Sequence, residues 1–114
     1  MPIVSETMSI SEISITELKG LIDRGCMVID VREADEYVAG HVPGAISVPL
    51  SVLTENVDAF PDGSTTYVIC QAGGRSMRAC EYLEGFGKQV VNVAGGTGAW
   101  IASGNVVVPG ESPR

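Results

Sequence analysis

Short apolar runs, each bounded by glycine, proline or aspartate, recur through the middle of the 114-residue chain. They occupy residues 27–29, 46–48, 67–69 and 90–93. Continuous runs of this length are typical of strands that are covered on both faces, as in a parallel sheet. We therefore predict strands at these four positions.

Helical patterns lie between the runs. Ser14 and Glu17 have the S-x-x-E spacing of a capping box, an apolar stripe follows, and Gly25 suits a C-terminal cap, so a first helix is predicted over residues 15–24. Further helices are expected at residues 33–39, 50–53, 75–83 and 97–102. Strands that alternate with helices predict an α/β domain with a mainly parallel sheet.

Composition and charge narrow the range of ligands. With 45% hydrophobic and 18% charged residues, the chain is expected to fold, and its length suits one domain. Seven Lys and Arg residues against fourteen Asp and Glu residues give a net charge of −7. Such a field repels nucleic acid and anionic lipid, whereas a small anion can still bind where local dipoles reverse the potential.

The chain start and the cysteines carry further information. The opening MPIVSETMSI lacks the basic region and apolar run of a signal peptide, and no segment reaches the about 18 apolar residues of a membrane span. We expect a cytoplasmic protein without a membrane partner. Cys26, Cys70 and Cys80 are an odd number without C-x-x-C spacing, which argues against a disulfide framework and a zinc site, so no metal is expected.

Cys70 stands where the predicted strand 67–69 ends and a helix begins near Arg75. Ligands of parallel α/β sheets bind at such strand ends. The adjacent glycines Gly73 and Gly74 let consecutive backbone N–H groups converge on one point, and the helix start and Arg75 add positive potential. These features favour a thiolate at Cys70, with a pKa below the usual value of about 8.5.

The segment CQAGGRS, residues 70–76, resembles the active-site loop of the rhodanese (thiosulfate:cyanide sulfurtransferase) family, with its C-x-x-G-x-R-S pattern. VIDVREADEYVAGHVPGAISVPL, residues 28–50, is similar to the upstream signature of that family, and GGTGAW, residues 95–100, to its downstream G-G-x-x-x-W. The resemblance extends from about residue 10 to residue 103. It implies the rhodanese-like fold, a single domain with a mainly parallel five-stranded sheet flanked by helices on both faces.

The two ends of the chain look peripheral to the domain, and the resemblance also implies a chemistry. Residues 1–8 are expected to form a flexible N-terminus, 9–104 the rhodanese-like domain and 105–114 a C-terminal tail. The thiolate would take a sulfane sulfur from a donor such as thiosulfate, carry it as a persulfide and pass it to cyanide or a thiol, without a cofactor. The implied residues are catalytic Cys70 and Arg75, the persulfide cradle of Gln71, Ala72, Gly73, Gly74, Arg75 and Ser76, and the supporting ion pair of Asp30 and Arg32.

Two other functions are compatible with this loop. Rhodanese-like domains also serve as non-catalytic binding or regulatory modules, usually where the cysteine has been lost. Phosphatases with a C-x5-R loop use similar parts, but here residues 71–74 put only four positions between Cys70 and Arg75. Because one residue spans up to about 3.5 Å, the shorter loop favours a single sulfur atom over a phosphate group.

The sulfur donor is left open by the residue after the cysteine. Gln71 stands where many thiosulfate-using relatives have a basic residue, and it can hydrogen-bond an oxyanion but adds no charge. Thiosulfate, a persulfide and a protein donor or acceptor are therefore the alternatives.

Several residues outside the loop are expected to be structural. His41 lies in a Gly-His-Val-Pro-Gly turn that the family uses structurally. Arg78 is expected to pair with Glu81 one helical turn away, with an extension of the positive patch toward the loop as the alternative. Cys80 follows Cys70 by ten residues, about 15 Å along a helix, too far for a disulfide. The run AGGTGAW lacks the Lys-Ser/Thr of a nucleotide loop and is a weak signal by itself.

Overall fold

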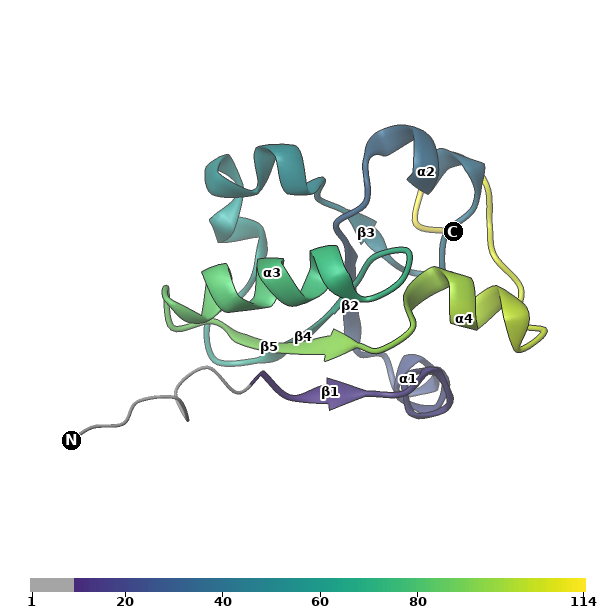
Figure 1. The fold of residues 1–114 in the computed structure, drawn as a ribbon, viewed down its shortest axis with the longest axis horizontal. Coiled ribbons are helices and arrows are strands. Elements are labelled where there is room, and N and C mark those ends of the chain that lie inside the picture. Colours follow the sequence, from purple (N-terminus) through teal and green to yellow (C-terminus); the bar gives the residue numbers. More distant parts are fainter. Residues whose placement is uncertain (1–9) are drawn as a thin grey trace.

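The computed structural model describes residues 10–114, so the N-terminus expected at residues 1–8 lies outside the described residues. Five strands form one sheet in the order β1-β5-β4-β2-β3, and all neighbouring strands run parallel (Figure 1). The strands are β1 (Glu12–Ile13), β2 (Met27–Asp30), β3 (Ile46–Ser47), β4 (Thr65–Ile69) and β5 (Gln89–Val93). This confirms the expected α/β class and parallel sheet.

The helices alternate with the strands as predicted. They are α1 (Ile15–Asp23), α2 (Ala34–Ala39), α3 (Gly74–Glu84) and α4 (Gly96–Ala102), with the 3-10 helices η2 (Leu50–Glu55) and η3 (Val57–Ala59) before β4. The predicted capping box starts α1: the Ser14 hydroxyl accepts the Glu17 N–H at 3.1 Å, and the Glu17 carboxylate accepts the Ser14 N–H at 2.9 Å. Gly25 follows the Arg24 cap with φ of +83°.

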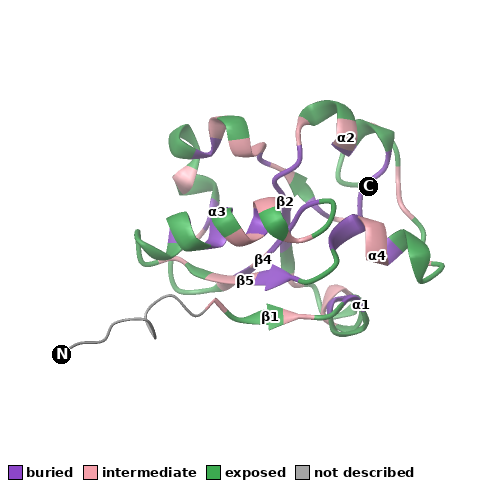
Figure 2. Ribbon diagram, viewed as in Figure 1, coloured by how far each residue is buried: buried purple, intermediate pink, exposed green. Residues whose placement is uncertain are grey.

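Each face of the sheet is covered by its own helices. Because side chains of a strand alternate between faces, neighbouring residues of β2 enter different clusters. Ile29 packs with Leu83 of α3 on one face, and Val28 packs with Leu18 of α1 and Trp100 of α4 on the other. Buried residues accordingly concentrate in the central strands and the inner sides of the helices (Figure 2).

The carboxyl ends of the central strands meet at one edge of the sheet. Asp30 at the end of β2 pairs in register with Ile69 at the end of β4, and Val68 of β4 pairs with Asn92 of β5. Three segments therefore leave the sheet side by side: the Asp30 turn, the loop after Ile69 and the start of α4. This edge is where a parallel α/β sheet places its ligand site.

The segment 105–114, expected to be a C-terminal tail, lies against the domain. Val108 exchanges two backbone hydrogen bonds of 2.9 Å with His41, and the Trp100 indole N–H donates to the Val106 carbonyl at 2.7 Å. Along residues 10–114, no helix is both long enough and apolar enough to cross a membrane.

Candidate active site

Cys70 directly follows β4, and its side chain is almost fully buried, with 1% of the residue exposed. Its Sγ accepts the backbone N–H of Gly73 at 3.1 Å and the hydroxyl of Ser76 at 3.2 Å. Burial raises the pKa of the thiol, but hydrogen bonds from the Ser76 hydroxyl and from the N–H groups of Ser76, Gly73 and Ala72 together outweigh it. The net pKa of Cys70 is therefore lowered, as an environment for a thiolate requires.

The two glycines of the loop have different roles. Gly73 has φ of +108°, a left-handed conformation that favours glycine, and it forms the N-cap of α3. Gly74 is the first residue of α3, lacks a positive φ, and has open space where a Cβ would stand. Of these two positions, only position 73 therefore requires glycine, because its left-handed conformation turns the N–H group toward Cys70.

The start of α4 binds the back of the loop through main-chain hydrogen bonds. The Thr97 N–H donates to the Cys70 carbonyl at 2.8 Å, and the Gly98 N–H donates to the Gln71 carbonyl at 2.9 Å. A Cβ on Gly96 would lie 2.3 Å from the Cys70 carbonyl oxygen, so only glycine allows this approach. The run AGGTGAW, a weak signal in the sequence, thus orients the carbonyl groups of the loop.

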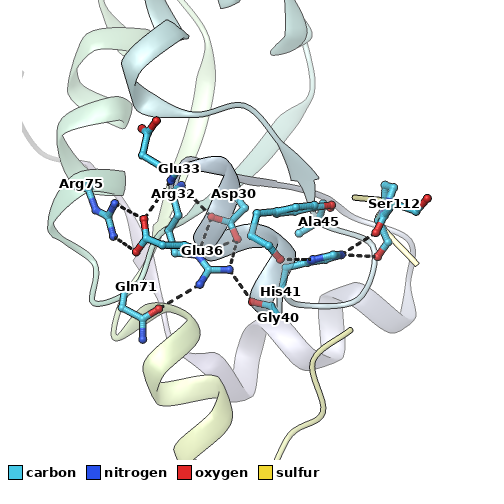
Figure 3. A network of polar contacts seen from close by, with 12 residues as sticks. Asp30, Arg32, Glu33, Glu36, Gly40, His41, Ala45, Gln71, Arg75 and Ser112 are labelled. Atoms are coloured by element: carbon cyan, nitrogen blue, oxygen red, sulfur yellow. Dashed lines mark hydrogen bonds and ion pairs between the residues drawn. The ribbon is translucent and has the colours of Figure 1, made fainter. Parts of the chain in front are cut away.

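The Arg75 side chain is not free at the loop, because it forms an ion pair with Glu36 of α2. Its two terminal nitrogens lie 2.8 and 2.9 Å from the two carboxylate oxygens (Figure 3). The hydrogen bond from Arg75 is the main cause that lowers the pKa of Glu36 to about 2. The charge expected of Arg75 at the thiolate is therefore compensated by a carboxylate to which the sequence pattern assigned no role.

A second ion pair, between Asp30 and Arg32, reaches the loop through Gln71. Asp30 is completely buried and Arg32 is 3% exposed, with an Arg32 Nη2 to Asp30 Oδ2 distance of 2.8 Å. Arg32 also donates to the Gly40 carbonyl at 2.8 Å and to the Gln71 side-chain oxygen at 3.2 Å (Figure 3). The pair expected to support the site is thus in contact with the residue after Cys70.

His41 is buried and lies beside Tyr37 in the polar network of Figure 3. Its ring stacks on that of Tyr37 with centroids 3.7 Å apart, and its Nδ1 lies 2.9 Å from the Tyr37 carbonyl oxygen. Its Nε2 lies 2.8 Å from the carbonyl oxygen of Ser112 (Figure 3). Both ring nitrogens thus contact main-chain carbonyls, which is a structural arrangement.

Other candidate residues lie outside the site or differ from expectation. The expected pair of Arg78 and Glu81 is wrong: of the ion pairs between described residues, none includes Arg78. Burial, followed by nearby negative charges, raises the pKa of the Cys80 thiol to about 12. Within the described part of the chain, no three His, Cys, Asp or Glu side chains are grouped to hold a metal ion.

The family model described as Rhodanese-like domain matches residues 14–103. A putative sulfurtransferase of Bacillus subtilis, YtwF, is 38% identical over 82% of this chain and 92% of its own length. A putative sulfur carrier protein of the same organism, YrkF, is 34% identical over 81% of this chain, which spans 51% of that protein.

Solved structures agree with these matches. A rhodanese-related protein from Thermoplasma volcanium superposes with a TM-score of 0.80 and 35% sequence identity, covering 86% of this chain and 97% of that one. The family match extends over most of the chain and includes Cys70, Arg75 and the α4 residues that hold the loop. This chain is a member of the rhodanese-like domain family.

Proposed function

We propose that this protein is a sulfurtransferase in which Cys70 carries a sulfane sulfur as a persulfide. The observation that carries the proposal is the pair of donors at the thiol: the Gly73 N–H at 3.1 Å and the Ser76 hydroxyl at 3.2 Å. Both stabilise a negative charge on sulfur. Membership of the rhodanese-like family and relatives named as sulfurtransferases support this activity in general.

The proposed cycle has two displacement steps at sulfur. The Cys70 thiolate attacks the outer sulfur of the donor, and the donor S–S bond breaks with its electron pair on the leaving group, which is sulfite from thiosulfate or a thiolate from a persulfide. An acceptor then attacks the terminal sulfur of Cys70–S–S⁻. Cyanide leaves as thiocyanate, a thiol leaves as a persulfide, and the Cys70 thiolate is restored.

The loop supplies the electrostatic part of this cycle. We expect the N–H groups of residues 71–75 to bind the terminal persulfide sulfur as an oxyanion hole binds oxygen. Arg75 lies in the first turn of α3, where its guanidinium, oriented by Glu36, adds N–H dipoles. Gly73 and Ser76 hold the inner sulfur in the same place in both steps.

The charges at the loop favour a persulfide donor over thiosulfate. Arg75 is paired with Glu36, Arg32 with Asp30, and Gln71 is neutral. A dianion such as thiosulfate gains little from cations that carboxylates already compensate. We therefore propose a persulfide, on a small thiol or on a partner protein, as the preferred donor, because its reacting end carries at most one negative charge, with a thiol as acceptor.

The test of this function is a measurement of intact mass. After incubation with glutathione persulfide, the protein should gain one sulfur that cyanide removes, and the Cys70→Ser protein should gain none. Equal gain by the Cys70→Ser protein would refute Cys70 as carrier, and no gain with any donor would favour a non-catalytic binding module. Steady-state rates with thiosulfate and glutathione persulfide then identify the donor class.

A further inference from the structure

The carbonyl oxygen of Gly73 is the meeting point of three donors. The Asn92 side-chain amide and the Met77 N–H each lie 3.2 Å from it, and the Ser76 hydroxyl lies 3.3 Å from it. The same hydroxyl lies 3.2 Å from Cys70 Sγ. A serine hydroxyl has a single proton, so the Gly73 carbonyl and the thiolate compete for it.

Asn92 lies under this carbonyl at the centre of the sheet. It is completely buried on β5 and pairs in register with Glu12 of β1 and Val68 of β4, so it points to the face that α3 covers. Its amide nitrogen donates to the Glu12 carboxylate at 2.8 Å as well as to Gly73. Both neighbours are acceptors, which determines that the nitrogen and not the oxygen of the amide faces them.

This asparagine occupies a position where an apolar side chain would pack more easily. Its in-register neighbour Val68 belongs to the apolar cluster under α3, and two residues earlier on the same strand Val90 packs against that cluster. Among the described residues, the Asn92 side-chain oxygen finds no hydrogen-bond partner. A buried polar group that is only partly satisfied costs stability, so a functional role is expected to offset that cost.

We propose that Asn92 is a positioning residue for the sulfur site. Hydrogen bonds from the Asn92 amide and the Met77 N–H satisfy the Gly73 carbonyl oxygen. The Ser76 hydroxyl therefore donates its proton to Cys70 Sγ and not to that carbonyl. Glu12 holds the Asn92 amide in the orientation that this requires. The inference rests on the proposed function in one respect, since it assumes that the thiolate of Cys70 is the reactive form.

The test is a double-mutant cycle in which the thiolate of Cys70 is titrated by its ultraviolet absorbance, with the Cys70→Ser protein as baseline. Asn92→Ala and Ser76→Ala should each remove one hydrogen bond to the thiolate. In each variant the thiolate fraction on the acid side of the titration should therefore be about fivefold lower. Because Asn92 acts through Ser76, adding Asn92→Ala to Ser76→Ala should cause no further change.

Matched variants separate this role from a general loss of stability. Val90→Ala removes core volume from the same strand and face without touching Gly73. It should therefore lower the melting temperature and leave the pH dependence of the Cys70 thiolate fraction unchanged. Glu12→Gln and Glu12→Ala both remove the charge, but only Gln keeps the acceptor for Asn92. The Ala protein should therefore have the lower thiolate fraction of the two.

The inference is overturned if the Asn92→Ala titration coincides with that of the unmodified protein, if Val90→Ala shifts it equally, or if the Asn92 effect persists in the Ser76→Ala background. The titration requires no sulfur donor. A protein that shows the expected shifts but gains no sulfur in the mass measurement would refute the proposed function while supporting the role of Asn92.

Discussion

Glu36 and Arg75 lie 39 residues apart in the chain and form a bidentate ion pair, with nitrogen to oxygen distances of 2.8 and 2.9 Å. The pair joins α2 to the first turn of α3. A planar guanidinium bound by both of its terminal nitrogens has a fixed orientation. Glu36 thereby determines both where the arginine of the loop points and how far the positive charge of Arg75 is compensated.

Glu36→Gln should improve the use of thiosulfate. Gln retains one acceptor for Arg75 and removes the compensating charge, so we expect the KM for thiosulfate to fall about twofold to fivefold, with little change for glutathione persulfide. Glu33→Gln is the matched control, because Glu33 is the N-cap residue of the helix that contains Glu36 but its carboxylate binds Ser51, at 2.7 Å from the hydroxyl. An equal fall in the control would assign the effect to net charge.

The same pair should contribute to stability in a pH-dependent way. Its hydrogen bond to Arg75 lowers the pKa of Glu36 from 4.5 to about 2 in the folded protein. The ionised form is therefore favoured by folding: the contribution is complete above about pH 4.5 and is lost as the pH falls toward 2. Urea unfolding of the unmodified and Glu36→Gln proteins should show a difference that shrinks on acidification; a pH-independent difference would contradict this origin.

Gly96→Ala should disrupt the loop, because the new Cβ would lie 2.3 Å from the Cys70 carbonyl oxygen. Displacement of the loop is expected to reduce the rate of persulfide formation about tenfold or more. Gly104→Ala is the control, since Gly104 also has a positive φ, +84° against +59° for Gly96, but has open space around it. If both variants lose activity alike, backbone strain and not contact with Cys70 is responsible.

His41→Phe should lower stability without changing the thiol. The phenyl ring preserves the stack on Tyr37 and removes the contacts of both ring nitrogens with carbonyl oxygens, which should lower the free energy of unfolding by about 1–3 kcal/mol. The absorbance titration of Cys70 should not shift, because neither ring nitrogen of His41 contacts Cys70 or one of the groups that donate hydrogen bonds to it. A shifted titration would instead indicate that His41 takes part in proton transfer.

The regular elements could be predicted where their signal is local. The apolar runs at 27–29, 67–69 and 90–93 lie within β2, β4 and β5, and the capping box starts α1 as expected. β1 was missed because Glu12 and Ile13 form neither a run nor an alternating pattern. They become a strand only by pairing with Asn92 and Val93 of β5.

The loop could be predicted from the sequence, but the contacts that other elements make with it could not. A cysteine at a strand end, followed by glycine and a helix start, indicates a thiolate site within seven residues. Glu36 lies in the segment 28–50 that is similar to the family signature, and Asn92 interrupts the apolar run 90–93, but neither pattern indicates that the residue contacts the loop. The glycine run before Trp100 was visible, yet its meaning depends on the contact between Gly96 and Cys70.

The sequence by itself determined the α/β class, the position of the thiol and the presence of a glycine-containing turn after it, because these follow from short-range patterns and backbone sterics. Only the tertiary structure decided that Arg75 is compensated and that the Ser76 proton has a competitor. The physical reason is the strand order: placing β5, β4 and β2 side by side brings Asn92 and the Asp30 turn to the Cys70 loop, and α2 brings Glu36.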